Sequence, residues 1–177
     1  MNRNLSLKIG AILILGLFVT VFAGCSGSPT GPSVPSNDGP RLLTRTSSSM
    51  TALMGASLFL EQVIPASTGG RIELFDVVLD IPAGAVRNDT LFSIGIPDPS
   101  VFYNVFGTHG LVFDRPVTVT MSYRDADLTG VNESSLRIAY YNEKTGTFEA
   151  VNGVVDTNLK VVKAQLYHFS AYGLISD

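Results

Sequence analysis

Tryptophan is absent from this 177-residue chain, cysteine occurs once and histidine only twice. A single cysteine excludes an internal disulfide, and so few histidines and cysteines leave no spacing typical of a transition-metal site. The absence of tryptophan removes the best stacking surface for a sugar. The sequence also lacks a serine-hydrolase elbow and a phosphate-binding glycine loop with lysine, so we expect neither an enzyme with an external substrate nor a cofactor.

Charge of both signs is sparse. The chain has 12 lysines and arginines and 15 aspartates and glutamates. Arg3 and Lys8 precede the cysteine, whereas every acidic residue follows it, so the chain after position 25 carries a net charge of −5. The basic residues between Arg41 and Lys163 are scattered singly. Because a nucleic-acid surface needs a basic stripe, no nucleic-acid partner is expected.

The first 25 residues predict export and lipid attachment. Arg3 and Lys8 form a positive region, and the apolar run that follows, residues 9–23, is short for a membrane span, which needs about 20 residues. The run ends in "FAGC", which resembles the bacterial lipobox, with phenylalanine where leucine is usual. We therefore expect a lipoprotein signal peptide over residues 1–24 and a diacylglycerol on Cys25. The alternatives are an ordinary signal peptide with an incidental cysteine, or an uncleaved anchor helix.

Residues 25–56 are expected to tether the lipid to a folded domain. The stretch after Cys25 is rich in serine, glycine and proline and cannot bury enough apolar area to fold. Residues 42–56 leave open a short helix, a frayed strand or more linker. Ser26, not aspartate, follows Cys25, which in lipoproteins favours the outer membrane. The predicted location is thus the bacterial cell envelope, with the membrane contacted through the lipid and with envelope or cell-surface proteins as partners.

From residue 57 to residue 177 the pattern changes to short alternating runs broken by turn residues, which predicts strands with one buried face. The clearest run is "PVTVTMSY", in which Pro116 is expected to open the strand because it lacks the N–H that a ladder needs. The run from Leu159 to Ile175 is too long for one flat strand, so we expect a bend within it. Without helical crossovers, these strands predict an all-β fold, an antiparallel β-sandwich. The residues expected in its core are Leu79, Ile81, Phe92, Ile94, Phe113, Val117, Val119, Met121, Ile138 and Leu166.

Several motifs, taken in order, resemble the landmarks of the ZU-five domain of zonula occludens and netrin-receptor proteins. They are "GGRIELFDVVLDIPAGAV", "GLVFDRPVTVTMSY", "YYNEKTGTFEAV", "VVD" and "HFSAYGLI", and they span roughly residues 58 to 175. The resemblance implies a bacterial lipoprotein with one ZU-five-like sandwich. Domains of this kind serve as scaffolds without a shared substrate, so fold alone does not assign a function.

The tripeptide His168-Phe169-Ser170 carries two hypotheses. Some relatives with this motif look as though they cleave themselves between the phenylalanine and the serine. Carried over, the Ser170 hydroxyl would attack the carbonyl of Phe169, His168 would assist proton transfer, and water would hydrolyse the ester. If the strand instead continues unbroken, Leu166, His168, Ser170, Tyr172 and Leu174 share one face and the motif is structural. We favour the structural hypothesis.

Other candidate sites favour ordinary loop positions. His109 lies in "GTHGLVF", and Asp125 and Asp127 lie in "RDADLTG", which lacks the further ligands and closing glutamate of a calcium loop. We therefore expect no metal site. The sequence predicts a lipid-anchored envelope protein with a non-catalytic binding or structural module. The alternatives are a domain that cleaves itself at Phe169-Ser170 and a sugar- or calcium-binding envelope module.

Overall fold

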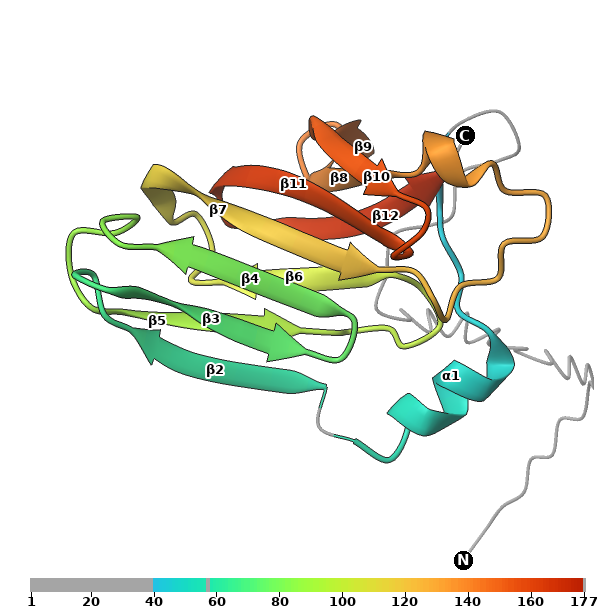
Figure 1. The fold of residues 1–177 in the computed structure, drawn as a ribbon, viewed down its shortest axis with the longest axis horizontal. Helices are drawn as coiled ribbons and strands as arrows, with labels where there is room; N and C mark the ends of the chain where they lie inside the picture. The colour runs from blue at the N-terminus through green and yellow to red at the C-terminus, as the bar shows by residue number, and fades with distance from the viewer. Residues whose placement is uncertain (1–39, 57, 177) are drawn as a thin grey trace, which may run out of the picture. The chain divides into compact units, whose positions relative to one another are not determined.

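The computed structural model describes residues 40–56 and 58–176, which form two antiparallel β-sheets packed face to face (Figure 1). The predicted all-β sandwich is therefore confirmed. The predicted signal peptide, Cys25 and the tether up to residue 39 lie outside the described residues. Within the described ranges, no helix is long and apolar enough to cross a membrane.

The smaller sheet has the strand order β10-β11-β7-β4-β3, and the larger sheet has the order β2-β5-β6-β12-β8-β9, with β1 paired to the end of β12. The smaller sheet consists of β3 (Gly69–Leu74), β4 (Val77–Pro82), β7 (Val112–Ser122), β10 (Gly153–Asp156) and β11 (Val161–His168). The larger sheet consists of β1 (Arg41–Leu42), β2 (Phe59–Ile64), β5 (Thr90–Gly95), β6 (Tyr103–Gly107), β8 (Arg137–Asn142), β9 (Thr147–Ala150) and β12 (Ala171–Ser176). The helical segments are α1 (Ser47–Leu53) and the 3-10 turn η1 (Glu133–Ser135).

The core lies between the two sheets and follows the alternation of the sequence. Successive side chains of a strand point to opposite faces, so every second residue of β4, of β5 and of β7 from Val117 onward points toward the core. All ten predicted core residues are buried. Val117, Val119, Met121 and Tyr123, the alternate residues of the run "PVTVTMSY", are fully buried.

The prediction that Pro116 opens its strand is wrong. β7 already begins at Val112, and Pro116 lies inside it. The ladder with β11 is irregular at this point: Leu166 pairs with Val117, and the next pair joins His168 to Val112. A bulge removes the need for an N–H at the proline, which is why the strand can run through it.

The predicted bend in the C-terminal run is confirmed, and it divides the run between the two sheets. β11 belongs to the smaller sheet and β12 to the larger one, with Phe169 and Ser170 between them. In Figure 1 the two strands lie in different layers. The alternative in which Leu166, His168, Ser170, Tyr172 and Leu174 share one face of an unbroken strand is therefore wrong, because a sheet change interrupts the alternation.

The segment before residue 57, whose structure the sequence left open, packs on the sandwich. β1 pairs with the end of β12, Leu42 opposite Ile175. Thr46 caps α1, since its hydroxyl accepts a hydrogen bond from the backbone N–H of Ser49. Leu53 at the other end of α1 is buried. The packed part of the described chain thus begins at β1.

Candidate functional site

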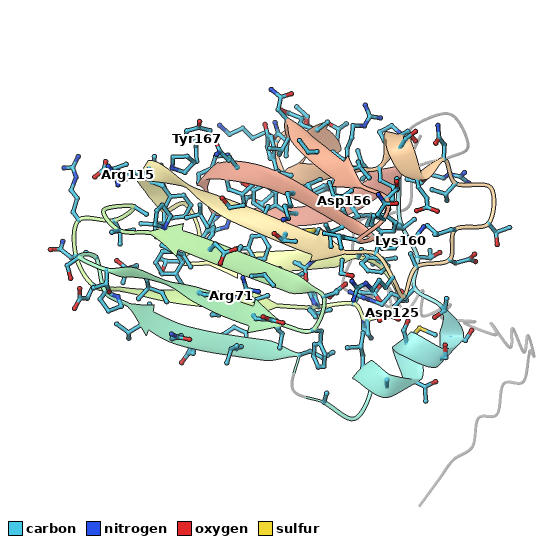
Figure 2. All side chains as sticks on the ribbon, in the orientation of Figure 1. Arg71, Arg115, Asp125, Asp156, Lys160 and Tyr167 are labelled. Carbon is cyan, nitrogen blue, oxygen red and sulfur yellow. The ribbon has the colours of Figure 1, made fainter. Side chains whose placement is uncertain are left out.

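His168, Phe169 and Ser170 form the crossover between the two sheets. His168 is the last residue of β11, and β12 begins directly after Ser170. Tyr167, the residue before His168, points away from the sandwich and is 60% exposed (Figure 2). The side chain of Phe169 turns the other way, into the core. The candidate peptide bond therefore lies where the chain passes from one layer to the other.

Phe169 is anchored in an aromatic cluster at this end of the core. Its ring is 1% exposed and meets the ring of Phe113 edge to face, with 4.8 Å between centroids. It also lies 5.2 Å from the ring of Phe92 and 5.7 Å from that of Phe106. The three rings lie on strands of both sheets, so the side chain of Phe169 contacts both layers. Such aromatic pairs add about 0.5 to 1.5 kcal/mol beyond the area they bury.

Backbone hydrogen bonds hold the crossover on both sides of the candidate bond. The N–H of Phe169 donates to the carbonyl of Leu111 at 2.9 Å. The carbonyl of Phe169 accepts from the N–H of Gly110 at 3.3 Å, and the carbonyl of Ser170 accepts from the N–H of Phe106 at 3.1 Å. Gly110 has a φ of +76°, a conformation that favours glycine. The turn before β7 is thus shaped to present an N–H to the carbonyl that self-cleavage would attack.

The imidazole of His168 lies against two tyrosines. The Tyr172 hydroxyl donates to the carbonyl of His168 at 2.8 Å and lies 3.4 Å from its Nδ1. The ring of Tyr140 meets the imidazole edge to face at 5.6 Å. Burial raises the pKa of the Tyr172 hydroxyl far above its ordinary value, so this hydroxyl stays protonated and remains a donor. Within the described chain, no hydrogen bond joins the imidazole to the Ser170 hydroxyl.

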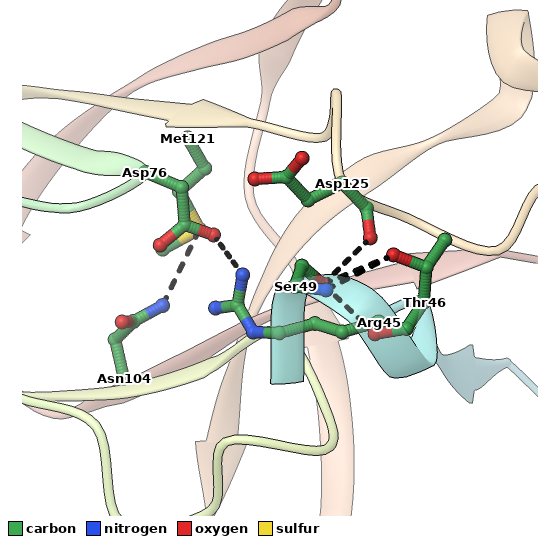
Figure 3. Close-up of polar contacts among 7 residues, drawn as sticks. All are labelled: Arg45, Thr46, Ser49, Asp76, Asn104, Met121 and Asp125. Atoms are coloured by element: carbon green, nitrogen blue, oxygen red, sulfur yellow. Dashed lines mark hydrogen bonds and ion pairs between the residues drawn. The ribbon is translucent and has the colours of Figure 1, made fainter. Parts of the chain in front are cut away.

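A second polar cluster, which the sequence did not predict, lies between the sheets near α1 (Figure 3). The guanidinium of Arg45 is 2.7 Å from Asp76, and both side chains are buried, 2% and 8% exposed. The guanidinium also lies over the ring of Phe102, 3.9 Å from its centroid. Asn104, fully buried, contacts the sulfur of Met121. The buried atoms Arg45 Nε and Nη2, Asp76 Oδ1 and Asn104 Oδ1 have no hydrogen-bond partner in the described part of the chain.

This cluster fastens the N-terminal segment to the sandwich. Arg45 precedes α1, whereas Asp76 lies in the turn between β3 and β4. Burial raises the pKa of the Asp76 carboxyl, and the nearby Arg45 opposes this only in part. No sequence signal identified the pair. Arg45 lies in the segment whose structure the sequence left open, and Asp76 lies in what the sequence indicates is an ordinary turn.

A cleft of about 740 Å³ opens beside this pair, between α1 and the outer face of the smaller sheet. Hydroxyl groups from both elements line it, together with charged side chains and the exposed ring of Phe75. Arg45 and Asp76 both contribute to its lining, although their unpartnered atoms are buried.

The remaining candidates lie on the surface. His109, Asp125 and Asp127 are exposed, and Asp127 accepts a hydrogen bond from the N–H of Thr129 at 3.0 Å. Hydrogen bonding to Thr129 lowers the pKa of the Asp127 carboxyl. In residues 40–56 and 58–176 no three side chains of the metal-binding types gather closely enough to hold an ion.

Comparison of the chain with protein-family models and with curated proteins found no match. The likeness to the ZU-five domain accordingly stays a resemblance carried by the short motifs. The candidate site is defined by its own geometry: a buried phenylalanine, a histidine between tyrosines and a serine directly before a central strand.

Proposed function

We propose that this chain is a lipid-anchored protein of the bacterial cell envelope whose β-sandwich is a non-catalytic binding or structural module. A structural role for the tripeptide is supported by the packing of its side chains. Phe169 fills the core between the sheets, and the imidazole of His168 contacts Tyr172 and Tyr140. These contacts account for His168 and Phe169 through packing and hydrogen bonding, without chemistry.

The membrane attachment rests on the lipobox at Cys25 and on the tether that follows it. A single acyl chain gives only marginal membrane binding, and a diacylglycerol supplies the further chain that stable anchoring needs. Ser26 after the lipidated residue supports the outer membrane as the location. The module would then act at the membrane surface on envelope or cell-surface proteins.

The anchor is tested by replacing Cys25 with serine in the bacterial host. We expect the wild-type chain to partition into detergent and to incorporate a labelled fatty acid, and the Cys25→Ser chain to lose both and to migrate as an unprocessed precursor. Two soluble proteins cleaved at the same place would contradict lipid anchoring. A Ser26→Ala chain, which keeps the thiol, is the matched control and should behave as wild type.

A second candidate function is self-cleavage at Phe169-Ser170, and one contact supports it. The Gly110 N–H donates to the Phe169 carbonyl oxygen, where negative charge would develop as the Ser170 hydroxyl attacked. In this reaction the Ser170 Oγ bonds to the Phe169 carbonyl carbon, the C–N bond breaks, and the hydroxyl proton passes by way of His168 to the leaving amine. Water then hydrolyses the ester to a Phe169 carboxylate and a free Ser170 hydroxyl. The intact-mass experiment in the Discussion separates this candidate from the structural one.

A further inference from the structure

β2 forms a free edge of the larger sheet. Among the described residues its one paired strand is β5, and the carbonyl of Leu58 accepts a hydrogen bond from the N–H of Ile96 at 2.9 Å. Backbone groups of an antiparallel strand alternate in direction, so the residues two and four positions after Leu58 also face β5. The N–H and C=O groups of Glu61 and Val63 consequently face away from the sheet. They can pair with an added strand.

The side chains of the same edge form an apolar surface. Val63 lies opposite Leu91 on the outer face of the sheet, and these side chains are 57% and 45% exposed. Phe59, on the same face of β2, is 55% exposed, and Val105 of β6, opposite Gly95, is 36% exposed. We call these residues, Phe59, Val63, Leu91 and Val105, the β2 apolar face. Contiguous exposed apolar side chains of this kind mark interaction surfaces.

β2 differs in protection from β3, one of the two edge strands of the smaller sheet. Edge strands are usually shielded by charges, prolines or bulges. On β3, Arg71 lies 3.0 Å from Asp80 and 3.2 Å from Glu73, and this charged group covers the outer face of that edge (Figure 2). β2 carries a single charge, Glu61, in the middle of the β2 apolar face. Its carboxylate has no ion pair or hydrogen bond with another described side chain.

We propose that β2 binds an extended strand of a partner protein, which adds to the larger sheet and places a basic residue opposite Glu61 between two apolar residues. This proposal rests on the proposed binding function of the module. The backbone of Glu61 and Val63 supplies the ladder groups. The carboxylate of Glu61 selects the basic residue by charge, and Phe59 and Val63 select the flanking apolar ones.

Pairing of β2 with β2 of a second copy is disfavoured by the same carboxylate. Two such strands keep their faces aligned only in certain registers. The register that sets Phe59 opposite Val63 of the copy also sets Glu61 opposite Glu61 of the copy, and like charges in direct opposition destabilise a sheet. The register shifted by one pair sets Glu61 opposite Val63, a charge against an apolar side chain. Glu61 therefore discourages self-association and favours a basic partner.

A labelled heptapeptide tests this proposal. Threonines occupy the odd positions of the peptide, and valine, lysine and valine occupy the even positions in that order. The lysine is therefore flanked by apolar residues on one face. Its binding is measured by fluorescence anisotropy to the full chain reconstituted in phosphatidylcholine nanodiscs, whose neutral surface does not attract the lysine. We expect saturable binding that weakens roughly fivefold or more in Glu61→Lys. A peptide with glutamate in place of lysine should restore binding to that variant.

Matched controls separate strand addition from general attraction. Glu143→Lys makes the same charge change in the loop between β8 and β9 and should leave binding unchanged. A peptide methylated at alternate backbone nitrogens should not bind, because it cannot complete the ladder. Equal binding to wild type and Glu61→Lys, or unchanged binding of the methylated peptide, would overturn the proposal. Dimerisation of the wild-type chain through β2 would do so too. Failure here leaves the processing of Cys25 unaffected, so the anchor is judged separately.

Discussion

Burial raises the pKa of the Asp76 carboxyl more than its ion pair with Arg45 lowers it. Desolvation raises its pKa, and the hydrogen bond and the charge of Arg45 reverse only part of that effect. A buried ion pair of this kind contributes little net stability, because both charges have lost water. Its effect is positional: it joins the segment before α1 to the turn between β3 and β4.

The raised pKa of Asp76 predicts a pH dependence of stability. Because the folded state binds the proton more tightly than the unfolded state, the free energy of unfolding should fall as pH rises from 3.8, the ordinary value, through the raised pKa. The slope for one proton is at most about 1.4 kcal/mol per pH unit. Asp76→Asn keeps an oxygen for Arg45 and has no proton to lose. The variant should therefore gain stability relative to wild type as pH rises through this window.

Urea denaturation of both proteins across the acidic to neutral range measures this difference. Glu143→Gln, which removes an exposed carboxylate from a loop, should follow the wild-type profile. Parallel profiles for wild type and Asp76→Asn would show that Asp76 has the same proton affinity folded and unfolded.

Residue burial was predictable from the sequence where it depends on local alternation. Phe92, Val117 and Met121 were assigned to the core because strands have a period of two, and the structure confirms them. The pair of Arg45 and Asp76 was not predictable, since the two residues are 31 positions apart and only tertiary packing brings them together.

Gly173 governs the contact between β12 and the N-terminal segment. A Cβ at this position would lie 2.4 Å from Cδ2 of Leu42 and 3.0 Å from the carbonyl oxygen of Phe102. Glycine therefore leaves the space that Leu42 fills beside the central strand. Leu43, the next residue, donates its N–H to the carbonyl of Leu174 at 2.8 Å.

Replacing Gly173 with alanine should displace Leu42 and loosen β1. We expect a loss of about 1 to 3 kcal/mol in the free energy of unfolding, as for other overpacked positions. Hydrogen exchange at the amide of Leu43 should also become faster. Gly55→Ala is the matched control, because nothing lies within 4 Å of a Cβ there. Unchanged exchange at Leu43 in Gly173→Ala would mean that β1 does not depend on this contact.

At the level of strands, the sequence predicted their faces but not their sheets. Both sheets share the period of two, so alternation cannot tell which layer a strand joins. The length of the C-terminal run indicated a bend, but its position depends on Phe169 packing against Phe92 and Phe113 from elsewhere in the chain. The prediction that Pro116 opens its strand was wrong for a similar reason, because the bulge that accommodates the proline involves β11.

The last strand is central to the whole sandwich. β12 lies between β6 and β8, and all six of its residues are buried. β1 pairs with its end, so the first and last strands of the described chain meet (Figure 1). The segment after Phe169-Ser170 is therefore held by three paired strands, β1, β6 and β8, and by the core. Cutting that bond would leave β12 in place as long as the protein stays folded.

This retention determines how self-cleavage must be measured. Native mass or gel filtration would report one particle whether or not the bond is cut, so the mass must be taken after denaturation. We expect the denatured wild-type chain to have the mass of a chain uncut at Phe169-Ser170. This follows because Phe169 is fixed by its aromatic contacts and the imidazole of His168 by Tyr172 and Tyr140. Ser170→Ala should differ from wild type only by one oxygen atom. A denatured wild-type sample that lacks the segment from Ser170 onward, beside intact Ser170→Ala and His168→Ala chains, would overturn the structural function and establish self-cleavage.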